Sequence, residues 1–393
     1  MDTGAPAAGA NPDLINQCVH CGFCLQACPT YALWGNEMDS PRGRIYLMKM
    51  ANEGTVQIDK QWVGHMDSCL GCVSCMTACP SGVDYGKLIE ETRAQIERVY
   101  ERPRVERWYR ALILNTFPRI GVLRVMRFFL AAYQSLGLPA LNKLAPKLGP
   151  REVVAGVTPA KGIKRARVGL MLGCVQREFL PEINAATARV LAAEGCEVVA
   201  PAAQGCCGAL LMHAGKDREA EALTRRMIAD FDAAGVDVII TNAGGCGSHL
   251  KQFSPKFKDV AEFLVELGPR AARHPIAMRV AYHDSCHLQH AQKVRTQPRE
   301  LLNGIPGLEL QEIPESALCC GSAGIYNLVQ PKTAEQLGDR KAAHIQALAP
   351  ELIATGNVGC ILQMRAALER RSMKAPVLHT IQILDASLLG KTP

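Results

Sequence analysis

The chain has 393 residues, of which 48% are hydrophobic and 21% charged, an ordinary composition for a soluble protein of two or three domains. It contains no run of about 18 apolar residues, which excludes a membrane-spanning helix. The unusual features are its 17 cysteines and a net charge of +7 that is unevenly distributed.

The first segment, residues 1–12, is rich in Ala, Gly and Pro, carries Asp2 and has no apolar run of signal-peptide length. We predict that it is a short disordered tail and that the protein is cytoplasmic. In a reducing compartment, clustered thiols indicate metal or redox chemistry rather than a disulfide framework.

Two cysteine runs follow, and both have the spacing C-x2-C-x2-C-x3-C-P. Three thiolates spaced in this way can curl round one face of a cubane cluster, while the fourth reaches a second cluster. We therefore predict two [4Fe–4S] clusters with crossed ligands. The first set is Cys18, Cys21, Cys24 and Cys79, and the second is Cys69, Cys72, Cys75 and Cys28.

Neighbouring residues support the cluster interpretation. A proline follows the last cysteine of each run, and Gly22 and Gly71 allow the backbone to approach inorganic sulfide. The alternative is a pair of zinc sites, which usually combine two separated C-x2-C pairs rather than four cysteines in one run.

Residues 13–101 are predicted to form a mostly helical ferredoxin domain. Its expected helices cover 45–51 and 84–100, the latter with Ile89, Ile96 and Val99 on one face. Arg42 and Arg44 lie between the two cysteine runs. They could contact cluster sulfides or a partner's carboxylate, or they could belong to a solvated loop.

Residues 102–165 are predicted to be a basic, helical linker. Between Arg102 and Arg167 there are 14 Lys and Arg residues against two acidic ones. The segment 118–133 reads as an amphipathic helix. Its cationic arc is Arg119, Arg124 and Arg127, its apolar side is Val122, Val125, Phe128 and Phe129, and Lys143, Lys147 and Arg151 follow it.

Three interpretations of this linker stay open. It could dock on anionic lipid, dock on an acidic partner subunit, or simply pack its apolar side inward between two domains. We predict no binding of nucleic acid, because no recognition motif accompanies the charge.

The remaining cysteines reveal an internal duplication, predicted as repeat 1 over 166–275 and repeat 2 over 276–393. Cysteines of the two copies are offset by 112, 113, 113 and 114 residues, a register that indicates a duplicated domain. They are Cys174, Cys206, Cys207 and Cys246 in repeat 1, and Cys286, Cys319, Cys320 and Cys360 in repeat 2. Cys196 lies outside this pattern and fits a small core residue.

Each repeat alternates strand-like and helix-like segments, which predicts an α/β fold with small parallel sheets and crossover helices. The cysteines fall just beyond strand ends, where such sheets place ligands. Expected strands are 167–172, 196–200, 236–241, 279–283, 308–313 and 351–355, and expected helices are 181–195, 217–234 and 333–347. Near Cys286 lie His283, His287 and His290, which are either structural or linked to a redox proton.

The tandem Cys-Cys-Gly resembles the CCG domain of heterodisulfide reductase-type proteins, in which a repeat of five cysteines can hold a non-cubane [4Fe–4S] cluster. The final cysteine of that pattern is replaced here by His249 in repeat 1 and Gln363 in repeat 2. The resemblance implies that the four remaining thiols of each repeat bind metal, with one or two further clusters. An empty thiol site and a partner-docking surface are the alternatives, and disulfide reduction is not expected.

The whole chain, from about residue 12 to 390, resembles the iron–sulfur subunit of glycolate oxidase, and also the C subunit of anaerobic glycerol-3-phosphate dehydrogenase. The flanking strings favour the former. They are Cys18-Val19-His20-Cys21-Gly22-Phe23-Cys24, Pro29-Thr30-Tyr31, Pro41-Arg42-Gly43-Arg44-Ile45-Tyr46-Leu47, Cys79-Pro80-Ser81-Gly82-Val83 and Tyr85.

This resemblance implies an oxidoreductase complex in which a separate FAD-binding subunit oxidises glycolate to glyoxylate. The present chain would carry the electrons towards a membrane quinone, with possible contact at the inner face of the cytoplasmic membrane. No nucleotide-binding G-x-G-x-x-G or P-loop is found, in agreement with an electron relay that lacks a substrate site.

Two alternatives remain. The partner could oxidise another 2-hydroxy acid, such as lactate, or glycerol 3-phosphate, since this chain does not encode the substrate. In a different class of function, the clusters could be structural metal in an assembly module without redox turnover.

Overall fold

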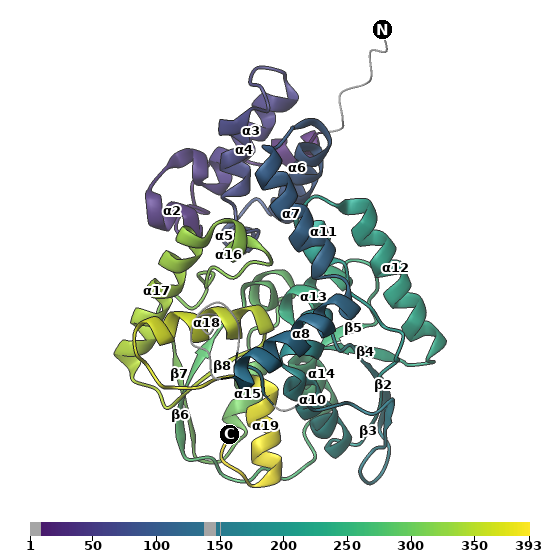
Figure 1. The fold of residues 1–393 in the computed structure, drawn as a ribbon. Coiled ribbons are helices and arrows are strands. Elements are labelled where there is room, and N and C mark those ends of the chain that lie inside the picture. Colours follow the sequence, from purple (N-terminus) through teal and green to yellow (C-terminus); the bar gives the residue numbers. More distant parts are fainter. Residues whose placement is uncertain (1–8, 137–146, 150) are drawn as a thin grey trace.

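The computed structural model describes residues 9–136, 147–149 and 151–393 (Figure 1). A helical N-terminal region lies at one end of the molecule. A helical hairpin connects it to two α/β repeats, which lie side by side (Figure 1). The fold class is therefore the predicted one: a helical ferredoxin-type region followed by duplicated α/β repeats with parallel sheets.

The N-terminal region is built from short, well-capped helices. Side chains of Asn11, Ser40, Asp59 and Asp84 each accept a backbone N–H at a helix start, which satisfies donors that the first turn leaves unpaired. Its elements are α1 (Pro12–Asn16), α2 (Pro29–Trp34), η1 (Glu37–Asp39), α3 (Pro41–Asn52), α4 (Lys60–Asp67), α5 (Ser74–Ala78) and α6 (Tyr85–Val99).

Two expectations for this region are corrected. Ala10 is buried and Asn11 caps α1, so the predicted tail is wrong for residues 9–12, while residues 1–8 lie outside the described part. Arg42 and Arg44 lie in the first turn of α3 rather than in a solvated loop, because Pro41 and the Ser40 cap begin a helix there.

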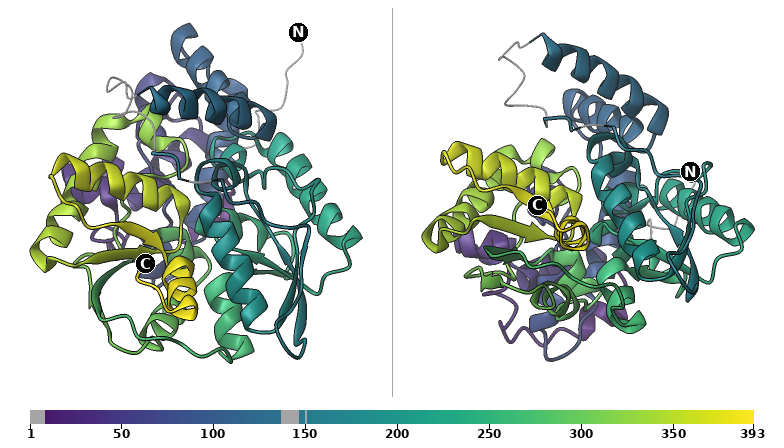
Figure 2. Two further views of the ribbon diagram at one scale, coloured as in Figure 1. Left: turned by 60° about the horizontal axis from the view of Figure 1, so that its bottom comes forward. Right: turned by 90° about the horizontal axis from the view of Figure 1, so that it is seen from below.

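The hairpin consists of α7 (Arg104–Thr116) and α8 (Ile120–Ser135). It crosses the α/β repeats in Figure 1 and lies at the periphery of the molecule in Figure 2. Helix α8 is the predicted amphipathic helix, shifted by two residues at each end. Lys143 lies outside the described residues.

The interpretation that α8 packs its apolar side inward is wrong. Val125, Phe128 and Phe129 are 55%, 69% and 65% exposed. Arg127 instead points inward and donates to the Glu178 carbonyl at 2.8 Å and to the Gly149 carbonyl at 3.4 Å. These two backbone carbonyls provide acceptors that a hydrophobic side chain could not use, so Arg127 turns towards the protein, while Arg119 and Arg124 of the cationic arc stay exposed.

Repeat 1 contains a five-stranded sheet in the order β1-β3-β2-β4-β5. All neighbours are parallel except the pair β1–β3, in which a two-residue strand runs antiparallel at the edge. The strands are β1 (Val157–Thr158), β2 (Ala166–Leu170), β3 (Cys196–Val199), β4 (Val238–Thr241) and β5 (Phe257–Asp259).

Repeat 2 contains a four-stranded parallel sheet in the order β7-β6-β8-β9, which reproduces β3-β2-β4-β5 strand for strand. The internal duplication inferred from the cysteine register is thus visible in the topology. The strands are β6 (Met278–His283), β7 (Leu308–Glu312), β8 (Leu352–Thr355) and β9 (Val377–His379).

Helices surround both sheets and again correspond between the copies. In repeat 1 they are α9 (Cys174–Phe179), α10 (Pro181–Ala193), α11 (Ala209–His213), α12 (Asp217–Ala233), α13 (Gly244–Leu250) and α14 (Val260–Leu267). In repeat 2 they are η2 (His287–Ala291), α15 (Gln297–Asn303), α16 (Tyr326–Val329), α17 (Pro331–Leu348), α18 (Val358–Arg370) and α19 (Thr380–Leu389).

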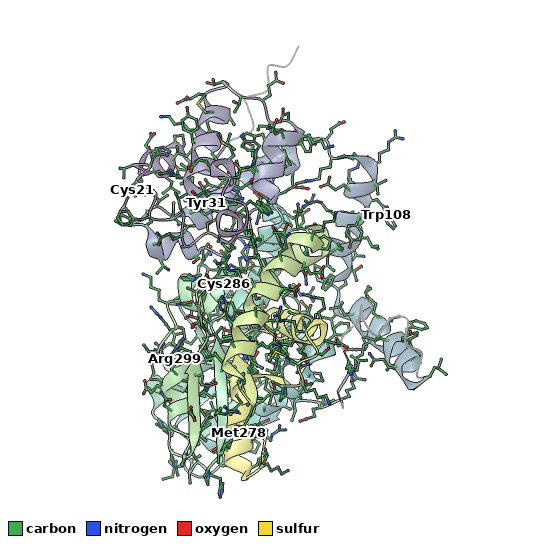
Figure 3. All side chains as sticks on the ribbon, turned by 90° about the vertical axis from the view of Figure 1, so that its left-hand side faces the viewer. Cys21, Tyr31, Trp108, Met278, Cys286 and Arg299 are labelled. Carbon is green, nitrogen blue, oxygen red and sulfur yellow. The ribbon has the colours of Figure 1, made fainter. Side chains whose placement is uncertain are left out.

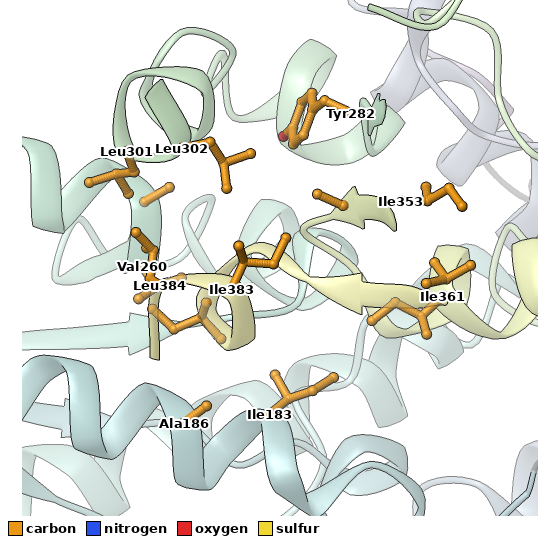
Figure 4. Packing of buried hydrophobic residues seen from close by; sticks show 14 of the residues in the cluster. Ile183, Ala186, Val260, Tyr282, Leu301, Leu302, Ile353, Ile361, Ile383 and Leu384 are labelled. Atoms are coloured by element: carbon orange, nitrogen blue, oxygen red, sulfur yellow. The ribbon is translucent and has the colours of Figure 1, made fainter. Parts of the chain in front are cut away.

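The two repeats share one hydrophobic core by exchanging helix contacts. Ile183 of α10 faces Ile383 of α19 (Figure 4), and α15 of repeat 2 packs on α14 of repeat 1. Arg189 of α10 also forms a bidentate ion pair with Asp385 of α19, at 2.7 and 3.1 Å. Neither repeat buries its helices alone, so the pair folds as one unit.

The glycine of each Cys-Cys-Gly is required by close helix packing. Gly321 has φ +92°, and a Cβ there would lie 2.7 Å from the Ala334 carbonyl oxygen of α17. Gly208 repeats this arrangement against α12, with φ +91° and 2.5 Å to the Ala220 carbonyl oxygen. The glycine thus lets the cysteine loop lie directly on a helix.

We predict that Gly321→Ala lowers the free energy of unfolding by about 2–4 kcal/mol, since it adds a steric clash to a strained φ. Gly235→Ala is the matched control, because Gly235 has φ +61° with open space around it and should cost only about 1–2 kcal/mol. Anaerobic thermal melts followed by circular dichroism would measure both. Equal shifts for the two variants would contradict the close-packing argument.

Candidate metal centres

The first candidate centre lies at the surface of the helical N-terminal region. One cavity there is lined by all four thiols of the predicted first set, Cys18, Cys21, Cys24 and Cys79, with Cys75 at its inner side. Cys21 is exposed and lies at the outer edge of the molecule in Figure 3. The crossed ligand set predicted from spacing is therefore brought to one place.

The second candidate centre is buried beneath the first. Its thiols, Cys28, Cys69, Cys72 and Cys75, are all buried. Burial raises the pKa of Cys75, and the neighbouring Cys72, Cys69 and Cys28 raise it further. These pKa effects require the predicted second set to lie within interaction distance of one another.

Both sets fit iron–sulfur clusters. Crowding several thiols in a buried space opposes their ionisation, and iron bound to the sulfurs would offset this cost. The backbone is also shaped for close approach, since Gly22 and Gly71 have φ +89° and +62°, and Val73 has φ +53°. The Gly71 N–H already donates to Cys69 Sγ at 3.3 Å.

Arg44 is the fixed positive charge of the buried centre. Its side chain is 1% exposed and donates to the His65 carbonyl at 2.7 Å, to Ser68 Oγ at 2.8 Å and to Asp39 at 3.4 Å. Although burial raises the pKa of Cys69, the charges of Arg44 and Arg93 outweigh it and lower that pKa overall. Both arginines would stabilise a thiolate ligand at this position.

The thiols of each α/β repeat also gather at the carboxyl ends of their strands. Cys174 Sγ lies 3.7 Å from Cys206 Sγ, and Cys286 Sγ lies 3.9 Å from Cys319 Sγ. Hydrogen bonds from Cys174 and Cys207 lower the pKa of Cys206. The duplicated pattern therefore yields one thiol cluster per repeat.

The residues that replace the final cysteine of the family pattern take structural roles. His249 Nε2 is 2.8 Å from Thr224 Oγ1 of α12, and burial lowers its pKa to about 4. Gln363 donates to the Ala334 carbonyl of α17 at 2.9 Å. Both side chains fasten the cysteine-bearing helix to its neighbour.

Repeat 2 lies directly against the buried centre. Cys72 packs with Cys319, and burial together with Cys319 raises the pKa of Cys72. His287 Nε2 donates to the Gly71 carbonyl at 2.9 Å, and Tyr326 donates to the Ser68 carbonyl at 3.0 Å. The second ferredoxin-type motif and the Cys-Cys-Gly loop of repeat 2 thus form one continuous interior.

Two of the three candidate histidines are contacts between these parts. Burial lowers the pKa of His287 to about 4, so it is neutral at pH 7. His290 bonds Thr77 Oγ1 at 2.8 Å through Nδ1 and the Ala317 carbonyl at 3.1 Å through Nε2. His283 lies apart from them, at the end of β6.

Several contributors were not foreseen from sequence. Arg93 of α6 donates to the Cys69 carbonyl at 2.6 Å and to the His213 carbonyl at 2.9 Å, and Tyr85 donates to Cys69 Sγ at 3.6 Å. His213 also bonds Glu90 at 3.1 Å. Their partners are far away in sequence, so no local pattern marks them.

Within the described residues, no helix has both the length and the apolar sequence needed to cross a bilayer.

Comparison with known proteins agrees with the two parts of the structure. A 4Fe-4S dicluster domain model matches residues 14–83, and a cysteine-rich domain model (CCG) matches residues 168–251 and 280–365. A solved structure, a hypothetical protein from Helicobacter pylori, aligns with a TM-score of 0.53 at 11% identity over 89% of this chain and 68% of that one, a likeness of fold alone.

Relatives cover nearly the whole chain. The "Glycolate oxidase iron-sulfur subunit" of Escherichia coli (strain K12) is 36% identical over 95% of this chain and 94% of its own length. The "Probable glycolate oxidase iron-sulfur subunit" of Bacillus subtilis (strain 168) is 36% identical over 97% and 95%. A fumarate reductase (CoM/CoB) subunit of Methanothermobacter marburgensis is 29% identical over 94% of this chain and 72% of its own.

We predict that Arg44→Gln destabilises the buried centre, because it removes a buried charge and leaves Asp39 uncompensated, at a cost of about 3–5 kcal/mol. Anaerobically purified protein should fall from about eight irons per chain towards about four. Arg98→Gln is the control, since Arg98 pairs with Asp217 at the surface with both side chains about 40% exposed. Unchanged iron content and thermal stability in Arg44→Gln would contradict this role.

Proposed function

The chain belongs to the family of glycolate oxidase iron–sulfur subunits, and we propose that it receives electrons from an FAD-binding partner that oxidises glycolate to glyoxylate and passes them towards a membrane quinone. It is the electron-transfer subunit of such an oxidoreductase complex. Clusters held by its cysteines would supply one-electron transfer.

The observation that carries this proposal is the continuous series of thiol sites. The series begins at the exposed Cys21, continues through the buried Cys72 and reaches Cys319 of repeat 2, which packs against Cys72. In Figure 3 Cys21 and Trp108 lie on opposite sides of the molecule, with Cys286 between them. An electron relay needs a series of redox centres that leads from one surface into the interior.

We assign the entry point to the surface around Cys21. The cavity there is open to solvent on the outer side and also contains Arg42, which donates to the His20 carbonyl at 2.9 Å. Val19 and Phe23 beside it are each 68% exposed, which is unusual for large apolar side chains. A flavin-binding partner that docks here would cover both side chains and bring its flavin close to the first centre.

The exit would lie near the hairpin. Helix α7 packs on the segments that follow both Cys-Cys-Gly motifs, through Ile113 and Leu114 against Leu211 and Ile325. The hairpin thus connects the thiol clusters of the repeats to a surface rich in exposed apolar side chains. Those on α7 and α8 are Val105, Trp108, Tyr109, Leu112, Val122, Val125, Met126, Phe128 and Phe129.

We propose that this surface rests on the anionic headgroup region of a membrane, where a quinone acceptor is found. Exposed aromatic side chains suit the interface between lipid and water, and the exposed basic residues of the same hairpin are Arg104, Arg107, Arg119 and Arg124. The repeats themselves would hold one or two further metal centres. Docking on an acidic partner subunit is the alternative for the same surface.

The substrate assignment is tested by electron paramagnetic resonance. The chain, purified anaerobically with its co-purifying partners, should show reduced-cluster signals after glycolate is added, because the flavin subunit supplies the electrons. Iron well above about eight per chain would mean that the repeats are also occupied.

The control is the isolated chain, which should respond to dithionite but not to glycolate. If dithionite reduces the complex and glycolate does not, the glycolate assignment is wrong, and lactate and glycerol 3-phosphate are the next substrates. Clusters that respond to no donor, or zinc in place of iron, would favour the non-redox assembly module.

The membrane contact is tested by vesicle sedimentation. The double variant Phe128→Ser and Phe129→Ser should lose at least about 100-fold in affinity for phosphatidylglycerol vesicles, since each buried phenylalanine contributes about 1.5–3 kcal/mol. Ile163→Ser is the control, because Ile163 is 77% exposed but lies outside the hairpin. If the wild-type chain and the double variant both fail to bind vesicles, and only the double variant loses the flavin subunit, the surface is a subunit interface.

A further inference from the structure

One side-chain cluster in repeat 2 contains a donor that the cysteine pattern does not include. A ring nitrogen of His283 and the sulfurs of Cys320 and Cys360 all lie within 4.8 Å of one another, and all three residues are buried. His283 ends strand β6, Cys320 belongs to the Cys-Cys-Gly loop and Cys360 lies in α18. Three separate elements therefore converge on one point.

Apart from the adjacent thiol of Cys360, the imidazole of His283 has no protein partner there. Its side chain is 1% exposed, and neither Nδ1 nor Nε2 has a hydrogen-bond partner in the described structure. Leaving a buried polar group unpaired opposes folding, so the fold would not keep this histidine for packing alone. A metal ion between the imidazole and the two sulfurs would accept the lone pair of one ring nitrogen and so give that nitrogen a partner.

The duplication supplies an internal comparison. In repeat 1 the residue three before the first cysteine is Met171, which packs in an apolar cluster with Cys207 and Cys246. The same position relative to the thiols is thus occupied by a thioether in one copy and an imidazole in the other. Methionine fills this space well, so histidine is not required by the fold.

A second difference points the same way. Asn357, the N-cap residue of α18, donates from Nδ2 to Cys360 Sγ at 3.5 Å. The equivalent N-cap residue of α13 in repeat 1 is Ala243, which has no such donor. Hydrogen bonds to a ligand sulfur are typical of the shell around a metal thiolate.

We propose that repeat 2 holds a metal centre with mixed ligands, in which His283 contributes a nitrogen beside the thiolates of Cys320 and Cys360. Donors bound to one tetrahedral ion lie about 3.5–4 Å apart, and one thiol of the adjacent pair Cys286–Cys319, which is separated by 3.9 Å, can complete the set of four. Imidazole with thiolate suits zinc or iron. Repeat 1 offers no such nitrogen from the corresponding strand.

This centre lies on the relay side of the molecule, since Cys319 packs against Cys72 of the buried ferredoxin-type centre. The inference concerns the ligands of repeat 2 and does not depend on which substrate the flavin partner oxidises. Failure of the glycolate experiment would leave it unaffected, and its own failure would leave the relay from Cys21 to Cys72 unaffected.

The test uses the full chain, reconstituted anaerobically with ferrous iron and sulfide or with Zn²⁺. Iron and zinc are counted per chain, and nitrogen ligation is read by pulsed electron paramagnetic resonance for iron or by X-ray absorption at the zinc edge. The wild-type chain should hold metal beyond the irons of the two ferredoxin-type clusters, with one directly bound nitrogen.

His283→Met is the decisive variant, because the chain already tolerates methionine at the equivalent Met171. This variant should lose the nitrogen signal, and the metal attributable to repeat 2 should fall at least five-fold. The two N-terminal clusters should remain. His283→Cys should keep the metal and lose the nitrogen signal. His249→Ala, which removes the buried histidine of repeat 1, should change neither quantity.

Three outcomes would overturn the proposal: no metal beyond the two ferredoxin-type clusters, no bound nitrogen in the wild-type chain, or a nitrogen signal that survives in His283→Met. If the excess metal is iron, the centre is a cluster or iron site, and if it is zinc, the centre is structural.

Discussion

The packing of Cys72 against Cys319 is the contact on which the rest of the structure depends. It joins a helical module to an α/β module through two cysteine-bearing loops, at a place where neither loop could remain buried alone. The hydrogen bonds of His287 and Tyr326 to backbone carbonyls on either side of Cys69 maintain this contact. Two thiols meet within this interface, among the larger side chains of Leu70, Leu318 and Tyr326, so metal centres held on its two sides would lie close together.

Around this contact the protein distributes charge unequally. The buried centre has fixed positive charges in Arg44 and Arg93, whereas the surface centre is near Arg42, whose own partner Glu37 lies 2.6 Å away. The thiols of the two centres therefore ionise in different fields although their sequence motifs are identical. Burial, charge and hydrogen bonds around the sulfurs are the variables that set cluster potentials.

The sequence predicted those features that are encoded locally or by repetition. The cysteine spacing predicted a first ligand set whose four thiols line one cavity, and the family resemblance was confirmed by relatives that cover nearly the whole chain. The duplication predicted six strands, but β1, β5 and β9 were missed, because two or three residues carry no periodic pattern. The sheet itself stabilises these short strands by pairing.

What sequence could not supply were contacts between distant residues. Burial of the apolar side of α8 was one interpretation of the sequence. Arg127 points inward instead, because its acceptors are the backbone carbonyls of Glu178 and Gly149, which lie beyond the helix in the sequence. In the sequence, His283 is close to Cys286. Its neighbours in space are instead Cys320 and Cys360, which a strand, a loop and a helix bring together.

The contacts between helices of the two repeats have a consequence for how the protein folds during synthesis. Arg189 of α10 meets Asp385 of α19, a partner 196 residues later in the chain. During synthesis, the side of α10 that packs on α19 stays uncovered until α19 has left the ribosome, whereas its other side can already pack on β3. The core of the N-terminal module is formed by residues of that module alone and needs no later segment of the chain, so this module can fold first. Nascent repeat 1 is therefore a stage at which the growing polypeptide exposes apolar surface that only later residues can cover.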